Sequence, residues 1–145
     1  MATIRKQFSQ DLHDQFDTFG RDRIIKYYAD YGIELRNNPN QYGVDLIAYD
    51  DGDKIGYVEV EVRQSWKETI FPFDSLHVPE RKKKLLDNDL HTVLVSVNCY
   101  GTRAFICDYR TVLSSPLLES PNMYVTKGEK FYKVDTRSIN LVRLT

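Results

Sequence analysis

The chain has 145 residues, enough for one hydrophobic core and too few for two ordinary domains, so we expect a single domain over residues 1–145. Hydrophobic residues make up 41% and charged residues 28%, as in soluble globular proteins, and no apolar run approaches the roughly 20 residues of a membrane-spanning helix. The net charge of -1 disfavours a protein that coats nucleic acid nonspecifically, because such binding depends on neutralising many phosphates.

The amino terminus and the cysteines indicate a cytoplasmic protein. Residues 1–16 lack the basic segment, apolar stretch and cleavage site of a secretory signal. Cys99 and Cys107 have neither the spacing nor the companion histidines of a zinc site, and we expect free thiols in reducing cytosol. Nothing in the sequence indicates an organic cofactor or a membrane partner.

The first third of the chain predicts a long helix followed by a short strand. Between residues 9 and 31 apolar side chains recur mostly at spacings of three and four, and Gly32 is a natural stop. Gly20 could mark a break between two shorter helices, because glycine weakens a helix by about 1 kcal/mol relative to alanine. Residues 33–36 are expected to form a short strand.

The rest of the chain predicts a hairpin, a short helix and further strands. Residues 43–49 and 55–64 read as strands around a hairpin turn at 50–53. After a loop containing Phe71-Pro72-Phe73, the expected elements are a helix at 79–86, strands at 92–98 and 103–108, a helical turn at 109–113, and strands at 123–126, 130–134 and 140–144. This order indicates an α/β or α+β domain with a central mixed β-sheet flanked by helices.

The strand at 55–64 alternates between two kinds of side chain. Its valines share one face, and the other face carries Tyr57, Glu59, Glu61 and Arg63. Alternation alone is typical of a half-solvated antiparallel sheet and is no sign of chemistry. Asp45 is less ordinary, because it lies in the apolar stretch Gly-Val-Asp-Leu-Ile-Ala, where a lone carboxylate needs a partner or a metal. Counting outward from the turn places Asp45 opposite residues 58–59, beside Glu59.

This pattern resembles the core of the PD-(D/E)XK nuclease superfamily, which includes restriction endonucleases and archaeal Holliday-junction resolvases. An Asp opens the family's first core strand, and Glu-X-Lys lies on the next. Asp45 matches the Asp, Glu59 the first acid and Val60 the X, over a resemblance that covers about residues 20–86. It implies a restriction-endonuclease-like fold, DNA as substrate, and Mg²⁺ or Mn²⁺ held by Asp45, Glu59 and the Val60 carbonyl.

Glu61 stands where the family usually has lysine, at the position that orients the attacking water. A minority of restriction enzymes carry Glu-X-Glu, so the change is compatible with catalysis. A second frame takes Glu61-Val62-Arg63 as Glu-X-Arg, with Arg63 as the cation, but the first keeps the hairpin closer to the family pattern. Arg81 or Lys82, on the predicted helix that follows, could also stand in for the lysine.

The resemblance implies three further features. An acid on the first helix often joins the metal site, with Asp22 as the best match and Asp17 as the alternative. The basic run would contact DNA phosphates through Arg81, Lys82, Lys83 and Lys84. A solvated helix face explains these charges equally simply. Small nucleases of this fold commonly act as homodimers, which implies a homodimer here.

Three functions therefore stand open. The first is a Mg²⁺-dependent DNA endonuclease of the phage or mobile-element type. The sequence leaves open whether its cleavage is structure-specific. The second is a catalytically silent nuclease-fold module that binds nucleic acid or a protein partner, as the missing lysine would allow. The third is an interaction domain with a merely amphipathic strand, in which Asp45 would be exposed and distant from Glu59.

Overall fold

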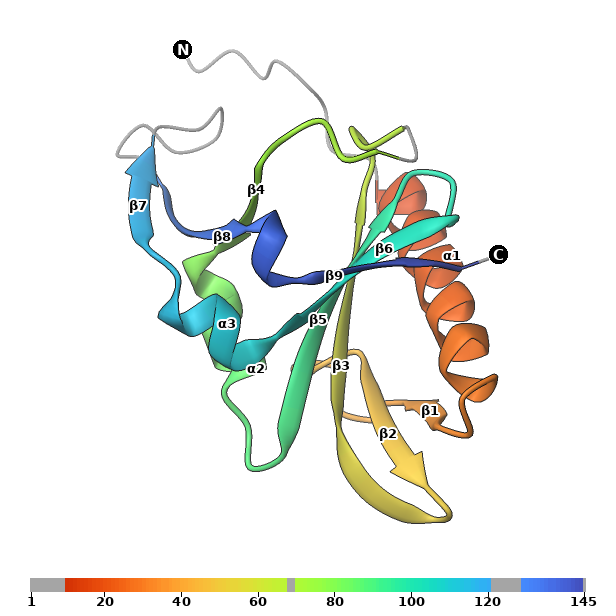
Figure 1. Ribbon diagram of the computed structural model, residues 1–145. Coiled ribbons are helices and arrows are strands. Elements are labelled where there is room, and N and C mark those ends of the chain that lie inside the picture. Colours follow the sequence, from red (N-terminus) through yellow and green to blue (C-terminus); the bar gives the residue numbers. More distant parts are fainter. Residues whose placement is uncertain (1–9, 68–69, 121–128, 145) are drawn as a thin grey trace.

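The computed structural model describes residues 10–67, 70–120 and 129–144 (Figure 1). They form two β-sheets with short helices between them and one long helix. The large sheet has the strand order β1-β2-β3-β5-β6-β9. Its strands are β1 (Glu34–Asn37), β2 (Leu46–Asp50), β3 (Asp53–Arg63), β5 (His91–Asn98), β6 (Arg103–Asp108) and β9 (Asn140–Arg143). The small sheet has the order β4-β8-β7, with β4 (Ser75–Pro79), β8 (Glu129–Asp135) and β7 (Leu117–Ser120).

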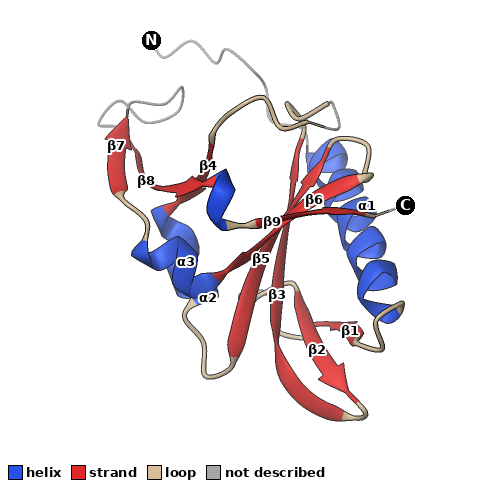
Figure 2. Cartoon of the chain, in the orientation of Figure 1, coloured by secondary structure: helices blue, strands red, loops and turns tan. Residues whose placement is uncertain are grey.

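The large sheet is mixed, as predicted. Strands β3 and β5 pair in parallel, and its other neighbouring strands pair antiparallel. Helix α1 (Gln10–Ala29) lies along one face, and the small sheet lies on the other side with η1 (Glu80–Lys82), α2 (Lys83–Leu86) and α3 (Tyr109–Ser114) (Figures 1 and 2). A last 3-10 turn, η2 (Thr136–Ser138), leads into β9. The prediction of a mixed central sheet flanked by helices is confirmed.

Two apolar clusters separate these layers. Between α1 and the large sheet, Ile24 packs with the valines of β3 and with Val95 and Val97 of β5. Between the large and small sheets, Trp66 packs with Leu76 and other side chains of β4, β6 and β8. Strand β3 therefore presents its valine face to α1 and its acidic face to the small-sheet side.

Gly20 does not break α1, and the prediction that it could is wrong. The helix continues through this residue, and a Cβ placed on Gly20 would lie 2.6 Å from Cγ2 of Val62. A glycine here lets α1 approach β3 more closely than any residue with a side chain would. The reason for Gly20 is thus tertiary packing, which helical periodicity alone cannot reveal.

The hairpin turn forms where the sequence predicted it. Asp50 pairs with Asp53, and the two residues between them, Asp51 and Gly52, have φ angles of 50° and 85°. Positive φ at both central positions matches the twist of the flanking strands and is typical of Asp-Gly turns. Cys99 and Cys107 are free thiols, as predicted.

Other predictions need correction or remain outside the described residues. The small-sheet strands β4 and β7 were not predicted, and the helix expected at 79–86 is a 3-10 turn plus one short helix after the β4 residue Pro79. The expected strand at 123–126 and the side chain of Asp17 lie outside the described residues. Across the described part of the chain, no helix is both long and apolar enough to cross a membrane.

Candidate functional site

The β2–β3 hairpin brings Asp45 and Glu59 together, as the count from the turn predicted. Leu46 pairs with Val58, so Asp45, one residue before β2, lies beside Glu59. The Asp45 N–H donates to Oε1 of Glu59 at 3.2 Å, and the Val60 N–H donates to Oδ2 of Asp45 at 2.9 Å. Asp45 is half-buried and Glu59 is buried. The third function considered above, an interaction domain with a merely amphipathic strand, required Asp45 to be exposed and distant from Glu59. This expectation is wrong.

Lys82 reaches Glu59 from η1, on the small-sheet side. Its Nζ donates to Oε2 of Glu59 at 2.7 Å, and the two side chains are 19% and 6% exposed. The chain after β4 turns inward at this residue, which gives the site a cation that β3 lacks at position 61. Lys82, one of the two basic residues predicted as substitutes for the strand lysine, therefore lies against the acid pair.

Burial and charge shift the titration of this pair. Burial raises the pKa of the Glu59 carboxyl to about 7; the charge of Lys82 opposes this rise and that of Asp45 adds to it. Burial alone would lower the pKa of Lys82, but the charge and hydrogen bond of Glu59 outweigh it and leave the pKa above its usual value. Lys82 is therefore charged at neutral pH, while Glu59 titrates there.

Glu61 and Arg63 lie next to this group on the same face of β3. The Arg63 guanidinium donates to Oε1 of Glu61 at 2.7 Å through Nη2, and the same nitrogen donates to the His77 carbonyl at 2.7 Å. Ser96 of β5 also donates its hydroxyl proton to Oε1 of Glu61. The carboxylate of Glu61 is thus held in place from two sides. Ser96 was missed by the sequence analysis, because only the β3–β5 pairing brings it beside Glu61.

The structure does not bring the other predicted residues to the acid pair. Asp22 is exposed on α1, which packs on the valine face of β3, opposite Glu59. Arg81 forms an ion pair with Glu129 of β8, and the residues that follow Lys82, Lys83 and Lys84, are exposed. The basic run therefore points one lysine inward and its neighbours outward.

The ligands available at the acid pair decide whether it fits a hard divalent cation. Among the described residues, no three His, Cys, Asp or Glu side chains are grouped to hold a metal ion. Asp45 and Glu59 nevertheless offer two carboxylates. The N–H and C=O of a strand residue face the same neighbour, so the carbonyl of Val60 leaves β3 on the side of Asp45. This all-oxygen set suits Mg²⁺, which usually takes one or two carboxylates and keeps several waters.

Comparisons with known proteins give a fold-level likeness. No protein-family model matches the chain, and no curated protein matches it. The chain is similar in structure to Hjc, a Holliday junction resolvase from the archaeal hyperthermophile Archaeoglobus fulgidus, with a TM-score of 0.49. The two are 12% identical in sequence, over 86% of this chain and 84% of the resolvase. At this identity the comparison assigns no role to any residue.

Proposed function

We propose that the protein is a Mg²⁺- or Mn²⁺-dependent DNA endonuclease that hydrolyses phosphodiester bonds. The observation that carries the proposal is the meeting of Asp45, Glu59 and Lys82, in which two carboxylates lie side by side and a largely buried ammonium bonds to one of them. Burying or half-burying three ionisable side chains costs free energy, and apolar side chains of similar size would pack here at lower cost. Their convergence therefore favours chemistry over structure.

Each side chain has a role in this proposal. Asp45, Glu59 and the Val60 carbonyl would hold the cation, which supplies an activated water and stabilises negative charge on the phosphate. The Lys82 ammonium would position that water or neutralise charge that develops on a phosphate oxygen. Glu61, fixed by Arg63 and Ser96, would make a second contact to the attacking water and so help to orient it. The exposed cations beside Lys82 would contact the DNA backbone.

A homodimer is part of the proposal, because one site per chain cuts one strand, and a double-strand cut requires two sites. The mass of the protein in solution, measured by light scattering, would test this part separately.

The second candidate is a catalytically silent module of the same fold. The observation in its favour is that the acid group, formed by Asp45, Glu59 and Glu61, already has cationic side chains as partners without a metal ion. Lys82 bonds to Glu59, and Arg63 bonds to Glu61. Such a group could persist as a structural ion-pair network on a nucleic-acid-binding protein. Calorimetric binding of Mg²⁺ or Mn²⁺ separates the two candidates, because a self-compensated network takes up no cation.

The test is cleavage of supercoiled plasmid and of a four-way junction with Mg²⁺ or Mn²⁺. We expect cutting by the wild type, its loss in Asp45→Ala, and its retention in the matched control Asp22→Ala, which removes an acid from the opposite side of the sheet. Circular dichroism verifies that both variants fold. No cutting of either substrate, together with no calorimetric binding of metal, would overturn the proposal and leave the silent module.

A further inference from the structure

A pocket of about 400 Å³ lies beside the acid group, at the end of β3. We call it the β3-end pocket. Its lining includes Arg63, Phe71, Phe73, Ser75, His77 and Lys133. Its volume is within the usual range for sites that bind small molecules or single groups of larger ligands. None of the roles proposed above uses this pocket except through Arg63.

Arg63 joins the pocket to the acid group. One nitrogen of its guanidinium donates both to Glu61, in the acid group, and to the backbone carbonyl of His77, in the pocket wall, each at 2.7 Å. The two sites are therefore separated by a single side chain. A chain-like ligand that is bound across the acid group would continue directly into the pocket.

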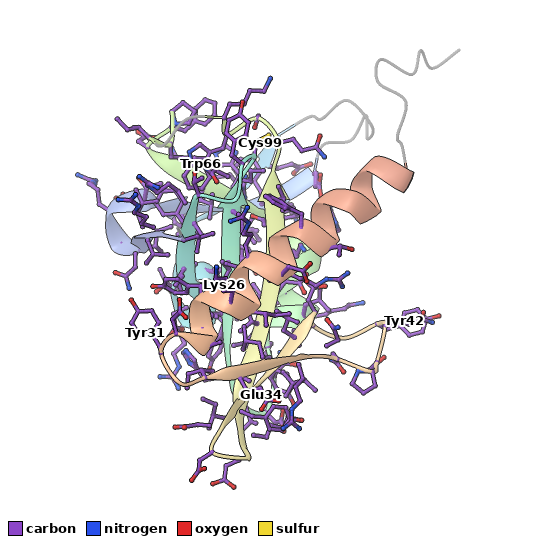
Figure 3. All side chains as sticks on the ribbon, turned by 90° about the vertical axis from the view of Figure 1, so that its right-hand side faces the viewer. Lys26, Tyr31, Glu34, Tyr42, Trp66 and Cys99 are labelled. Carbon is purple, nitrogen blue, oxygen red and sulfur yellow. The ribbon has the colours of Figure 1, made fainter. Side chains whose placement is uncertain are left out.

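One wall of the pocket is aromatic, and its rings pack against one another. Phe73 is 64% exposed, and its ring makes a T-shaped contact with that of Phe71, with 5.6 Å between the centroids. Phe71 in turn packs edge-on against Trp66 at 5.3 Å (Trp66 is labelled in Figure 3). An exposed ring held in this way offers a face on which a planar group can stack, and nucleic-acid bases stack on aromatic side chains without regard to sequence.

The other wall carries a cation. Lys133 of β8 pairs across the small sheet with His77 of β4, so their side chains share one face. No ion pair of Lys133 occurs within the described parts of the chain. Asp74 also lines the pocket, so a bound anion would lie against Lys133 rather than against this carboxylate. A second hollow of about 660 Å³ shares Asp74 and Lys133 and adds Asp135 and Arg137, which form an ion pair with each other.

We propose that the β3-end pocket binds an unpaired nucleotide of a DNA strand, with its base stacked on Phe73 and its phosphate against Lys133. This proposal rests on the proposed function and names its substrate class: DNA with single-stranded nucleotides next to the scissile phosphate, as in gaps, flaps and junctions. A base inside a continuous duplex is stacked on both sides and cannot use the aromatic wall. The pocket therefore gives a preference for DNA structure rather than sequence.

The test is fluorescence anisotropy with two labelled DNA duplexes, one intact and one with a short central gap, in Ca²⁺ without Mg²⁺. The wild type should bind the gapped duplex more tightly. Phe73→Ala should weaken that binding about fivefold or more, the effect of losing one base–aromatic stack, and leave the intact duplex unchanged. The slope of log affinity against log salt concentration for the gapped duplex should be smaller by about 0.7 in Lys133→Ala, the value for one single-strand phosphate.

Matched controls come from the same chain. Tyr31→Ala removes an aromatic ring that is 71% exposed and lies far from Trp66 (Figure 3). Lys130→Ala removes an exposed cation from β8 that is an odd number of residues from Lys133 and so faces the other side. Neither should change the preference for gapped DNA.

The outcomes separate this inference from the proposed function. Equal binding of the two duplexes by the wild type, or an equal loss for both in Phe73→Ala, overturns the pocket even if the enzyme cleaves. A preference for gapped DNA that Phe73→Ala abolishes supports the pocket, and it does so even where the plasmid and junction remain uncut, which would overturn only the endonuclease.

Discussion

Lys82 donates a hydrogen bond to Glu59 across 2.7 Å, although 23 positions separate the two residues in the chain. The lysine comes from the turn after β4 and the glutamate from the middle of β3, so two different layers of the fold meet at this bond. With the ammonium largely shielded from water and bonded to one of two adjacent carboxylates, the site has acid and cation in contact. Lys82 thus brings to the acid pair, from a separate element, a cation that position 61 does not supply.

Substitution of Lys82 tests the role of that cation. We expect Lys82→Ala to lower the single-turnover rate of DNA cleavage about 100- to 1,000-fold, the range for loss of one group that stabilises transition-state charge. The matched control is Lys83→Ala, which removes the next, exposed lysine. Lys83→Ala should retain nearly the wild-type rate. Equal rates for the two variants would mean that Lys82 serves only as a structural partner of Glu59.

The pKa of Glu59 predicts how the proposed cation site responds to pH. Burial raises this pKa to about 7, and cation binding requires the ionised carboxylate. A proton must therefore leave on binding below pH 7, and the apparent affinity for Mg²⁺ falls as the pH falls. Titration calorimetry should show binding about tenfold tighter at pH 8 than at pH 6. An affinity that is the same at both values would contradict Glu59 as a ligand.

The same shift predicts the stability of the metal-free protein. The pKa of Glu59 is higher in the folded than in the unfolded chain, so folding favours its protonated form. Its contribution to the free energy of unfolding is complete below the ordinary pKa of glutamate and is lost as the pH rises through about 7. The free energy of unfolding, measured with urea in EDTA, should therefore decline between pH 5 and pH 8. The decline should be smaller in Glu59→Gln. An identical decline in both proteins would assign it to other groups.

The acid pair could be predicted because its geometry is local. Asp51 and Gly52 set the turn, and the turn alone places Asp45 opposite residues 58–59. A register shift between Ala48 and Tyr49, which the sequence did not predict, then selects Glu59 as its neighbour. The resemblance to a nuclease family added the chemistry that such a pair would serve.

The remainder of the site depends on tertiary structure. Four consecutive basic residues offer no pattern that selects Lys82 over Arg81, and the choice follows from how η1 packs after β4. Ser96 reaches Glu61 only through the parallel pairing of β3 and β5, which joins segments more than 30 residues apart. Asp22 was placed by family analogy alone, and the packing of α1 on the valine face leaves it on the opposite side.

The two cysteines should differ in reactivity. Burial raises the pKa of the Cys107 thiol to about 12, and its side chain is fully buried, while Cys99 is partly exposed. Because the thiolate is the reactive form, a disulfide reagent should modify Cys99 in the native protein and Cys107 only after unfolding in guanidinium. The Cys99→Ser variant provides the control. Rapid native labelling of that variant would show that β6 opens readily.

Gly20→Ala should destabilise the protein, against the usual preference for alanine in a helix. In an exposed helix this change stabilises by about 1 kcal/mol. Here the new methyl would lie 2.6 Å from Cγ2 of Val62, a branched side chain with little freedom to move, and we expect a loss of about 1–3 kcal/mol in the free energy of unfolding.

A double variant isolates that contact. Val62→Ala removes the methyl that the new Cβ would meet, so Gly20→Ala should be less harmful in the Val62→Ala background than in the wild type. Thr18→Ala, at an exposed position of the same helix, serves as the control and should change stability little. Urea unfolding of the four proteins in the cycle gives the coupling free energy. A coupling of zero would mean that α1 shifts away from β3 without resistance, and close packing would then not be the reason for glycine at this position.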